Sequence, residues 1–395
     1  MRALFVVSRV PYPPWRGDQL RAYHLLRVLA PRHEVTCAVL ALRTPEAAAV
    51  AAVRRLGVAV EVLPLGIAGA APALLAGVLA GRPLQVALYE RRAAKRRLAR
   101  LAGRGFDVVH AQLVRTVPHA LAAAGTGPLV VDLVDALSLG SDRRAGQTRG
   151  PGRLLWRFEA RRLQAYEQVV LARATAATVV APADAAALAR HEGRVEVVPN
   201  GVELPVLGPA DAQPVPGRIV LAGNLGYFPN ADAARRLALE ILPLVRQARP
   251  SAHLRLVGAR PGRGVRRLTA LAGVTLAADV PDVGAEVRRA AVVVVPMRAG
   301  AGLQNKVLEA LAAARPLVTT SMVAEAVGLV DGEHALVADD VAGLAAATHR
   351  LLGDAALASR LGARGRALVA QRYTWEAAGA RMEALWCDAA GRSDV

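Results

Sequence analysis

The stretch VVVVPMRAGAGLQNKVLEALAAARPLVTT, residues 292–320, predicts a buried strand, a glycine-containing loop, a helix and a second buried strand. We expect the helix to begin near Gln304, after the loop that carries Gly300 and Gly302. Glycine lets the backbone approach a ligand closely, and a helix N-terminus offers unpaired N–H groups and a positive dipole. The stretch therefore predicts a parallel α/β sheet with a diphosphate site beside one of its strands.

Two charged residues of this helix fit such a site. Lys306 lies in the first turn, where the helix dipole disfavours a cation unless a bound phosphate reverses the penalty. Glu309 follows three residues later on the same helix face, where a carboxylate can accept hydrogen bonds from ribose hydroxyls. The alternative is an ordinary strand–loop–helix unit with a Lys–Glu pair on its surface.

The rest of the chain repeats strand and helix in two series. Near-continuous apolar strands that alternate with helices are typical of parallel sheets covered on both faces. The expected strands are residues 3–7, 35–41, 58–63, 107–111, 129–132, 177–180 and 195–198, then 218–222, 253–257, 274–277, 292–296 and 317–320. The expected helices include residues 18–29, 153–173, 232–247, 285–290, 305–314 and 341–352.

A segment rich in proline and glycine, residues 204–217, separates the two series and predicts a linker. We expect an N-terminal Rossmann-like domain over residues 1–204, a linker over 205–217, and a C-terminal nucleotide-binding Rossmann-like domain over 218–375. The last segment, 376–395, is expected to form a helix that can pack back on the first domain. Two doubly wound α/β domains place ligands at the carboxyl ends of their strands, and the cleft between such domains is the expected active site.

Composition narrows the class of protein. The 395 residues are 54% hydrophobic and 21% charged, which is typical of a globular chain. The most apolar segment, residues 67–79, is too short for a membrane span and contains Pro72. At the N-terminus, Arg2 precedes only five apolar residues, which favours a buried strand over a signal peptide. Cys37 and Cys387 form neither a disulfide framework nor a metal pattern, so we expect a cytoplasmic protein.

The net charge of +18 is unevenly distributed. Residues 1–200 hold 28 basic and 14 acidic residues, whereas residues 201–395 hold 22 and 18. The positive field indicates an anionic partner for the first half, and the basic segment at residues 91–104 predicts peripheral contact with an anionic membrane. The alternative is a solvated helix face in a chain that uses 48 Arg and two Lys. A second basic segment spans residues 143–162.

Six ordered segments resemble the retaining glycosyltransferases of family 4, which have the GT-B fold, and most of all the exopolysaccharide-type sugar transferases. They are VPYPPWRGDQLRAYHLLRVL at 10–29, AGNLGYFPNADA at 222–233, LRLVGARP at 254–261, DVPDV at 279–283, VPMRAGAGLQNKVLEALAAARPLVTT at 295–320 and GEHALVADD at 332–340. The resemblance covers the whole chain and implies transfer of a sugar, with retention, from a nucleotide diphosphate sugar to an acceptor hydroxyl. The resemblance leaves the nucleotide of the donor open among UDP, GDP, dTDP and ADP. It also leaves open whether the acceptor is a glycan, a lipid-linked molecule or a small molecule.

The resemblance also assigns residues of a donor site. Glu309 matches the second glutamate of the family's paired-glutamate motif and would bind ribose, and Lys306 or Arg298 would neutralise phosphate. The loop that holds the diphosphate and the sugar would comprise Gly300, Gly302, Leu303, Gln304 and Asn305. Gly17 and Asp18 match the N-terminal loop that faces the donor, and Glu325 would line the donor pocket.

The chain departs from the family pattern at two places. Ala301 stands where the first glutamate of the pair belongs, eight residues before Glu309, so that carboxylate contact with the sugar is lost or comes from elsewhere. The usual Arg and Lys after the first C-terminal strand are replaced by GNLGYFP at 223–229, where Gly223, Asn224 and the backbone would serve instead.

Candidate catalytic residues follow strands of the N-terminal half. His110 ends the predicted strand in FDVVHAQ, although Gln112 can equally occupy that position, and a lone histidine there can be structural. Asp132 and Asp135 flank the end of the next strand and are candidates to orient the acceptor, or else to cap a turn.

We expect no bound metal and no tightly bound cofactor, because the sequence has neither an Asp-x-Asp motif nor a His/Cys cluster with ligand spacing. In the mechanism that the resemblance implies, electrostatic stabilisation of the leaving diphosphate and domain closure supply the catalysis. The competing interpretations are another GT-B enzyme such as a sugar-nucleotide epimerase, a nucleic-acid-binding protein and an inactive GT-B scaffold. With 14 aromatic residues and no recognition motif, nucleic-acid binding fits poorly.

Overall fold

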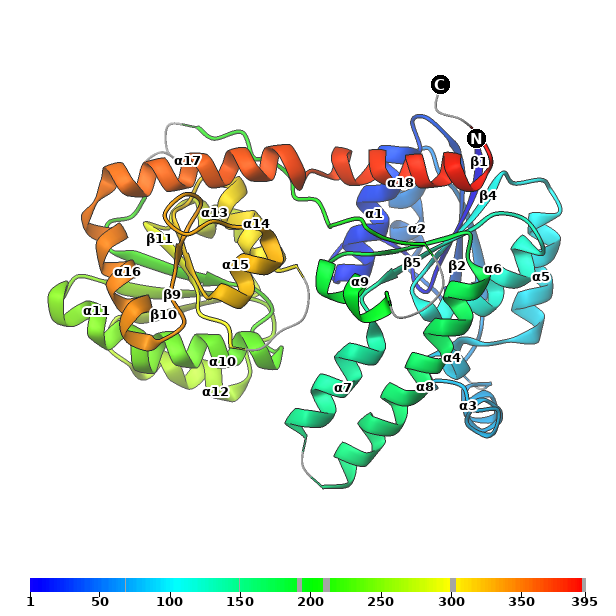
Figure 1. The fold of residues 1–395 in the computed structure, drawn as a ribbon, viewed down its shortest axis with the longest axis horizontal. Coiled ribbons are helices and arrows are strands. Elements are labelled where there is room, and N and C mark those ends of the chain that lie inside the picture. The colour runs from blue at the N-terminus through cyan, green and yellow to red at the C-terminus, as the bar shows by residue number, and fades with distance from the viewer. Residues whose placement is uncertain (68, 149, 190–193, 209–213, 299–302, 393–395) are drawn as a thin grey trace. The chain divides into compact units, whose positions relative to one another are not determined.

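The structure is a computed structural model that describes residues 1–67, 69–148, 150–189, 194–208, 214–298 and 303–392. The chain divides into two compact units, each built around its own sheet (Figure 1). Unit 1 comprises Met1–Asn200 and Trp375–Val395, and unit 2 comprises Gly201–Thr374. The first crossing between units therefore lies at Asn200, and the C-terminal helix belongs to unit 1.

Unit 1 contains a seven-stranded parallel sheet. Its strand order is β3-β2-β1-β4-β5-β6-β7. The strands are β1 (Arg2–Val7), β2 (Glu34–Ala41), β3 (Ala59–Pro64), β4 (Val108–Gln112), β5 (Leu129–Val134), β6 (Ala176–Val179) and β7 (Val195–Val197). The chain winds outward from β1 to β3 and then returns to pair β4 with the other edge of β1, so the topological switch point lies between β1 and β4.

The helices of unit 1 cover both faces of this sheet. They are α1 (Gly17–Leu29), α2 (Ala47–Arg54), α3 (Ala70–Leu79), α4 (Leu84–Tyr89), α5 (Arg92–Ala102), α6 (Val117–Ala124), α7 (Leu137–Gln147), α8 (Pro151–Arg173), α9 (Pro182–Leu188) and α18 (Trp375–Ala389), with a 3₁₀ turn at Val114–Thr116. Helices α7 and α8 form a hairpin that extends away from the sheet of unit 1 (Figure 1).

Helix α18 packs along α1 and completes the core of unit 1. Its first residue, Trp375, is 1% exposed and stacks on His24 of α1 with 4.5 Å between ring centroids. A Cβ on Gly379 would lie 2.4 Å from a methyl group of Val28, so glycine is needed where the two helices cross closely. The residues at the end of the chain are thus part of the first folding unit.

Unit 2 repeats the same winding in a six-stranded parallel sheet of order β10-β9-β8-β11-β12-β13. The strands are β8 (Arg218–Ala222), β9 (His253–Gly258), β10 (Val274–Ala278), β11 (Val292–Val295), β12 (Leu317–Thr319) and β13 (Leu336–Val337). The helices are α10 (Phe228–Arg236), α11 (Leu242–Ala248), α12 (Arg263–Arg266), α13 (Val283–Arg288), α14 (Asn305–Ala312), α15 (Ser321–Val327), α16 (Val341–Gly353) and α17 (Ala355–Arg372), with a π turn at Leu237–Ile241 and a 3₁₀ turn at Arg267–Ala270. Its switch point lies between β8 and β11.

Two details differ from the expected elements. The helix expected over residues 232–247 is divided, because Pro243 has no N–H for an α-helical hydrogen bond, and a π turn at Leu237–Ile241 takes up the mismatch before α11. Strand β13, Leu336–Val337, was not expected, since two residues leave no apolar run to detect. Within the described residues, no helix is both long enough and apolar enough to span a bilayer.

Candidate functional site

One candidate site lies at the switch point of unit 2, where β8 and β11 end. Gly223 follows β8 directly, and Met297 follows β11 by two residues. Helix α14 begins at Asn305 and brings Lys306 to both strand ends. The sequence folds this way because β11 is fully buried and α14 buries Val307, Leu308 and Leu311 against the same core, which fixes the first turn of α14 beside the sheet edge.

Lys306 is the central cation of this site and is only 8% exposed. Its Nζ donates to Asn230 Oδ1 at 2.7 Å, to Gln304 Oε1 at 2.9 Å and to Met297 Sδ at 3.2 Å. All three acceptors are neutral, and the thioether is a weak one. No carboxylate in the described parts of the chain forms an ion pair with Lys306, so no acidic side chain there neutralises the ammonium by direct contact.

Burial lowers the pKa of Lys306 from 10.5 to about 8, and the carboxylate of Glu309 opposes that change. The positive end of the helix dipole further disfavours a cation in the first turn. A buried cation at a helix N-terminus, held only by neutral acceptors, is stabilised by an added anion. The site is therefore suited to a phosphate group, which would replace the weak sulfur contact.

Glu309 lies one turn further along α14 with its side chain accessible to solvent. The protein around it nevertheless desolvates the carboxylate and raises its pKa to about 7, while Lys306 opposes the rise. An accessible carboxylate that is poorly solvated gains from hydrogen-bond donors, and two adjacent hydroxyl groups supply such donors.

The loop before α14 is described only from Leu303 onward. Gly300, Ala301 and Gly302, which the sequence places in the donor loop, lie outside the described residues. Leu303 packs against the core of unit 2, and Gln304 turns its side chain to Lys306 rather than capping the helix. Asn305 Oδ1 is buried, with no hydrogen-bond partner among the described residues.

The glycine after β8 makes room for the lysine. Gly223 has φ +141°, and a Cβ there would lie 3.2 Å from both Lys306 Cε and Asn230 Nδ2. The side-chain amide of Asn230 also donates to the backbone oxygen of Asn224 at 2.9 Å, so that Asn230 orients the lysine and closes the β8 loop at once. Asn224 Oδ1 accepts from the Gly226 amide at 3.1 Å and so shapes the turn.

The remaining donor candidates of unit 2, Arg298 and Glu325, differ from Lys306 in how their charges are placed. Arg298 forms a two-pronged ion pair with Asp232, with Nη2–Oδ1 at 2.9 Å and Nε–Oδ2 at 3.3 Å, and this pair raises the pKa of Arg298. Its charge is thereby compensated by the protein. Glu325 is exposed on α15. Of the two cations considered for phosphate, Lys306 is the one that forms no direct ion pair with a described carboxylate.

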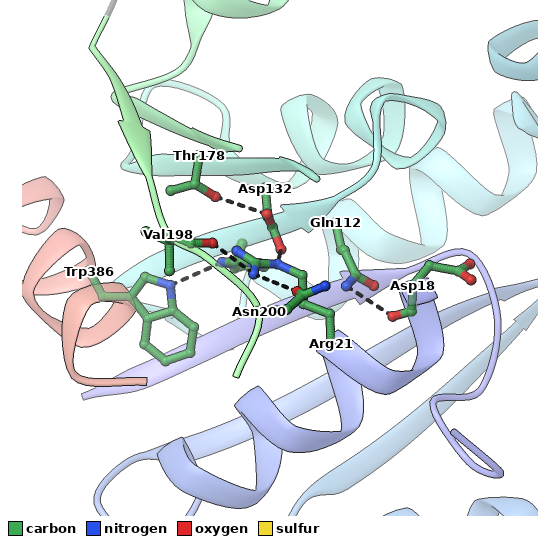
Figure 2. Close-up of polar contacts among 9 residues, drawn as sticks. Asp18, Arg21, Gln112, Asp132, Thr178, Val198, Asn200 and Trp386 are labelled. Atoms are coloured by element: carbon green, nitrogen blue, oxygen red, sulfur yellow. Dashed lines mark hydrogen bonds and ion pairs between the residues drawn. The ribbon is translucent and has the colours of Figure 1, made fainter. Parts of the chain in front are cut away.

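A separate group of candidate residues lies at the switch point of unit 1. Gly17 begins α1 and is exposed, with open space around the position of a Cβ. Asp18 follows in the first turn, where the helix dipole favours a carboxylate, and Arg9 Nε lies 3.2 Å from it. Gln112, the last residue of β4, donates from Nε2 to the Asp18 backbone oxygen at 3.1 Å (Figure 2).

Behind this edge, Arg21 of α1 holds together several strands of unit 1 (Figure 2). It is 0% exposed, and its Nε donates to Asp132 Oδ2 at 2.6 Å. Its Nη1 donates to the Val198 backbone oxygen at 2.9 Å and to Asn200 Oδ1 at 3.0 Å. Thr178 Oγ1 donates a hydrogen bond to the other carboxylate oxygen, Asp132 Oδ1, at 2.9 Å. Asp132 is thus bonded on both sides within the protein, in the manner of a structural residue.

His110 is also buried in this region, at 0% exposure. It stacks on Phe5 at 4.1 Å, and its Nδ1 accepts from Trp386 Nε1 at 3.1 Å. Desolvation lowers the pKa of His110 to about 4, so the ring is neutral at pH 7. Side chains two residues apart share a strand face, so Gln112 takes the same face at the open end of β4. The catalytic assignment of His110 stays a prediction, and its burial under α18 favours a packing role.

Asp135 lies just past β5 and is half-buried. Desolvation raises its pKa to about 6, and repulsion from Asp184 adds to the rise. A carboxyl group with a pKa near neutrality can exchange a proton at physiological pH, so Asp135 remains our catalytic candidate in unit 1. In the described part of the chain, no group of His, Cys, Asp and Glu is arranged to hold a metal ion.

Sequence reasoning did not single out Asn230, Met297 or Arg21. A signal existed for Arg21, because it lies four residues before Leu25 and eight before Leu29, on the buried face of α1. Asn230 lies in the quoted segment at 222–233, but nothing in a single sequence indicates that its amide would reach a lysine 76 residues away.

Two family models match the chain. Residues 15–205 match the model described as Glycosyltransferase Family 4, and residues 216–354 match the model described as Glycosyl transferases group 1. Both halves of the chain carry a glycosyltransferase domain. The second match includes β8, β11 and the whole Lys306 site, whereas the first match begins after β1 and includes β4. Among proteins of curated function, no sequence match is found.

Solved structures share the architecture of this glycosyltransferase chain at low sequence identity. HepE from Anabaena in complex with UDP is 15% identical, with a TM-score of 0.69, and the match covers 98% of this chain and all of HepE. The sucrose-phosphate synthase of Thermosynechococcus elongatus is 19% identical, with a TM-score of 0.66 and 98% coverage of each chain. WaaG, a glycosyltransferase involved in lipopolysaccharide biosynthesis, is 16% identical, with a TM-score of 0.64 and 97% and 99% coverage. The fold is GT-B, as expected.

Proposed function

We propose that this chain transfers a sugar from a nucleotide diphosphate sugar to an acceptor hydroxyl, with retention of anomeric configuration. The observation that carries the proposal is Lys306, a buried cation with three neutral acceptors at the N-terminus of α14 and the end of β8 and β11. Its chemistry fits the diphosphate of a donor, and Glu309 on the same helix fits the ribose. UDP is the first nucleotide to test, because HepE is solved with UDP and with UDP-glucose.

In the proposed reaction the acceptor oxygen bonds to the anomeric carbon on the face from which the diphosphate leaves. The bond between that carbon and the phosphate oxygen breaks, its electron pair stays on the diphosphate, and the acceptor hydroxyl passes its proton to that phosphate oxygen. The Lys306 ammonium and the amides of the α14 N-terminus would stabilise the charge that develops on the leaving group. We propose Gly17, Asp18 and Asp135 of unit 1 as the groups that face the donor and the acceptor.

The acceptor is proposed to be a glycan or a lipid-linked saccharide, and the place of action the cytoplasm. WaaG acts in lipopolysaccharide biosynthesis, which supports an envelope or extracellular saccharide as the product class. The thiols of Cys37 and Cys387 suit a reducing compartment.

The test is a thermal-shift screen with UDP-, GDP-, dTDP- and ADP-sugars, followed by a turnover assay with the stabilising donor. A ligand at 100 times its Kd stabilises the folded state by about 2.7 kcal/mol, well within detection. Release of nucleoside diphosphate with an α-linked product from an α-linked donor supports retaining transfer. Conversion of the donor sugar without release of diphosphate would indicate an epimerase instead. Stabilisation without any turnover would indicate an inactive scaffold, and no stabilisation by any donor would refute the nucleotide site.

A further inference from the structure

The outer face of α8 carries large apolar side chains that no other part of unit 1 covers. Leu154 is 70% exposed, Phe158 is 49% exposed, and Leu155 and Val169 are exposed as well. Residues 154, 158, 165 and 169 follow the helical repeat, so they form one stripe along the helix. A stripe of this kind on a helix hairpin that extends from its sheet is available to an external partner (Figure 1).

Helix α3 extends this apolar surface. Leu75 and Leu79 of α3 are 65% and 80% exposed. Arg162 of α8 donates to the backbone oxygen of Val78 at 2.8 Å and to that of Arg82 at 3.2 Å, and this fixes the end of α3 against α8. We call the exposed leucines, Phe158 and Val169 of these two helices the α3–α8 surface.

A cationic pocket opens on the same face. It has a volume of about 590 Å³ and is lined by Arg82, Lys95, Arg162 and Arg173, together with Tyr166 and Val169. Glu90 forms ion pairs with Arg82 and Lys95. Desolvation and the neighbouring Arg82 and Arg92 lower the pKa of Lys95. Glu159 also attracts Arg162. Four cations against these two carboxylates leave a positive excess, which an anion can relieve.

We propose that the α3–α8 surface docks on an anionic membrane and that the pocket receives the phosphate headgroup of a membrane lipid. The apolar side chains would enter the boundary of the acyl chains, while the arginines stay at the level of the phosphates. The pairing of an apolar stripe with a cationic pocket on one face favours a bilayer over a protein partner, since a bilayer presents phosphate and hydrocarbon side by side. The inference does not depend on the proposed transfer reaction.

This surface differs from the basic segment at residues 91–104 that the sequence indicated. Helix α5 carries most of that segment. Arg97 of α5 lies 4.0 Å from Glu61, which pairs with its charge, and Lys95 lines the pocket. The structure thereby moves the membrane contact from α5 alone to α8 and α3, where charge and apolar surface coincide. Among the basic residues of segment 91–104, Lys95 is the one that lines the pocket.

The test is co-sedimentation of the full chain with vesicles of phosphatidylcholine alone and of phosphatidylcholine with phosphatidylglycerol. Two variants probe the surface: Lys95→Gln with Arg173→Gln for the pocket, and Leu75→Ser, Leu79→Ser with Leu154→Ser for the apolar stripe. The controls are Arg360→Gln with Arg381→Gln, which removes the same charge from exposed positions elsewhere, and Leu239→Ser on unit 2, where Leu239 is 53% exposed. All the substituted leucines are exposed, so folding should be kept, and thermal unfolding confirms it.

The pocket variant should bind anionic vesicles about 25-fold more weakly, since each basic residue near such a surface changes affinity about fivefold. The leucine variant should lose the part of the binding that resists high salt, because salt screens only the charges. Equal sedimentation with neutral and anionic vesicles would overturn the proposal. So would a loss in the charge control as large as in the pocket variant, or a leucine variant that binds like the wild type. Inorganic phosphate that stabilises the wild type, without any vesicle binding, would show a free-anion site and would also overturn the membrane inference.

Discussion

Replacing Lys306 with methionine separates what the buried ammonium costs the fold from what it contributes to ligand binding. Methionine has a similar length and no charge. The folded-state pKa of about 8 lies below the ordinary 10.5, a difference that corresponds to about 3 kcal/mol against the charged form. Below pH 8 the lysine is charged in both the folded and the unfolded chain, so the folded state carries the whole penalty. As pH rises from 8 to 10.5 the folded protein loses the proton first, and the penalty is relieved.

The variant should therefore be as stable as the wild type at pH 7, or more stable by about 1 kcal/mol. The penalty of about 3 kcal/mol disappears, while the lost hydrogen bonds to Asn230 and Gln304 offset about 1 kcal/mol each. Binding of UDP should weaken by about 2–3 kcal/mol, or 30- to 150-fold, since a charge-assisted contact to phosphate is lost. Arg298→Gln is the matched control, and it should change UDP affinity little because Asp232 already balances that charge.

Calorimetric titration with UDP between pH 7 and 9.5 measures both effects. The affinity of the wild type should be constant up to about pH 8 and then fall by up to tenfold per pH unit, as the free protein loses the Lys306 proton that the phosphate requires. Lys306→Met should show a flat profile over the same range. A variant that binds UDP as tightly as the wild type, or a wild-type profile without a break near pH 8, would refute the assignment of Lys306 as the phosphate cation.

Three further predictions concern the donor site, the metal requirement and unit 1. Glu309→Ala should weaken nucleotide binding by about 1–3 kcal/mol through lost ribose hydrogen bonds, whereas Glu333→Ala on the same unit should not; equal losses in the two variants would remove the ribose assignment. Turnover should survive EDTA, and a loss that magnesium or manganese restores would reveal an overlooked metal site. Burial holds the pKa of His24 and His110 at about 4 and that of His119 at about 3, below the ordinary 6.5. The unfolded chain binds these protons first, so the free energy of unfolding should fall between pH 6.5 and 4, by up to about 3 kcal/mol per histidine. Urea unfolding at pH 7 and 4.5 tests this, and equal stability at the two values would contradict it.

The strands were predictable because both sheets are buried on two faces and their strands are continuous apolar runs. The run VVVV at 292–295 forms β11, and the strand expected at 218–222 is β8. Helix α14 was placed correctly from Asn305, since the loop glycines and the apolar spacing of Val307, Leu308 and Leu311 mark its start and its buried face.

Contacts between distant segments could not be predicted in the same way. The sequence placed Lys306 in a first helical turn, but its partner Asn230 comes from α10, 76 residues away, and Met297 comes from the segment after β11, so that the fold brings the three together. The ion pair of Arg298 with Asp232 joins residues 66 positions apart for the same reason. His110 was placed at a strand end, yet the side chain that covers it, Trp386, lies 276 residues further on.

The discontinuity of unit 1 reverses the usual order of events during synthesis on the ribosome. Residues 201–374 form one continuous stretch, so unit 2 can finish folding as soon as it has emerged. Unit 1 cannot, because Trp375 and Trp386 are part of its core. Trp375 stacks on His24, and Trp386 donates a hydrogen bond to His110. The N-terminal half must therefore persist as an incomplete domain until the last turns of α18 are translated. A stop codon after residue 374 would leave unit 2 intact and would damage the half of the protein that was made first.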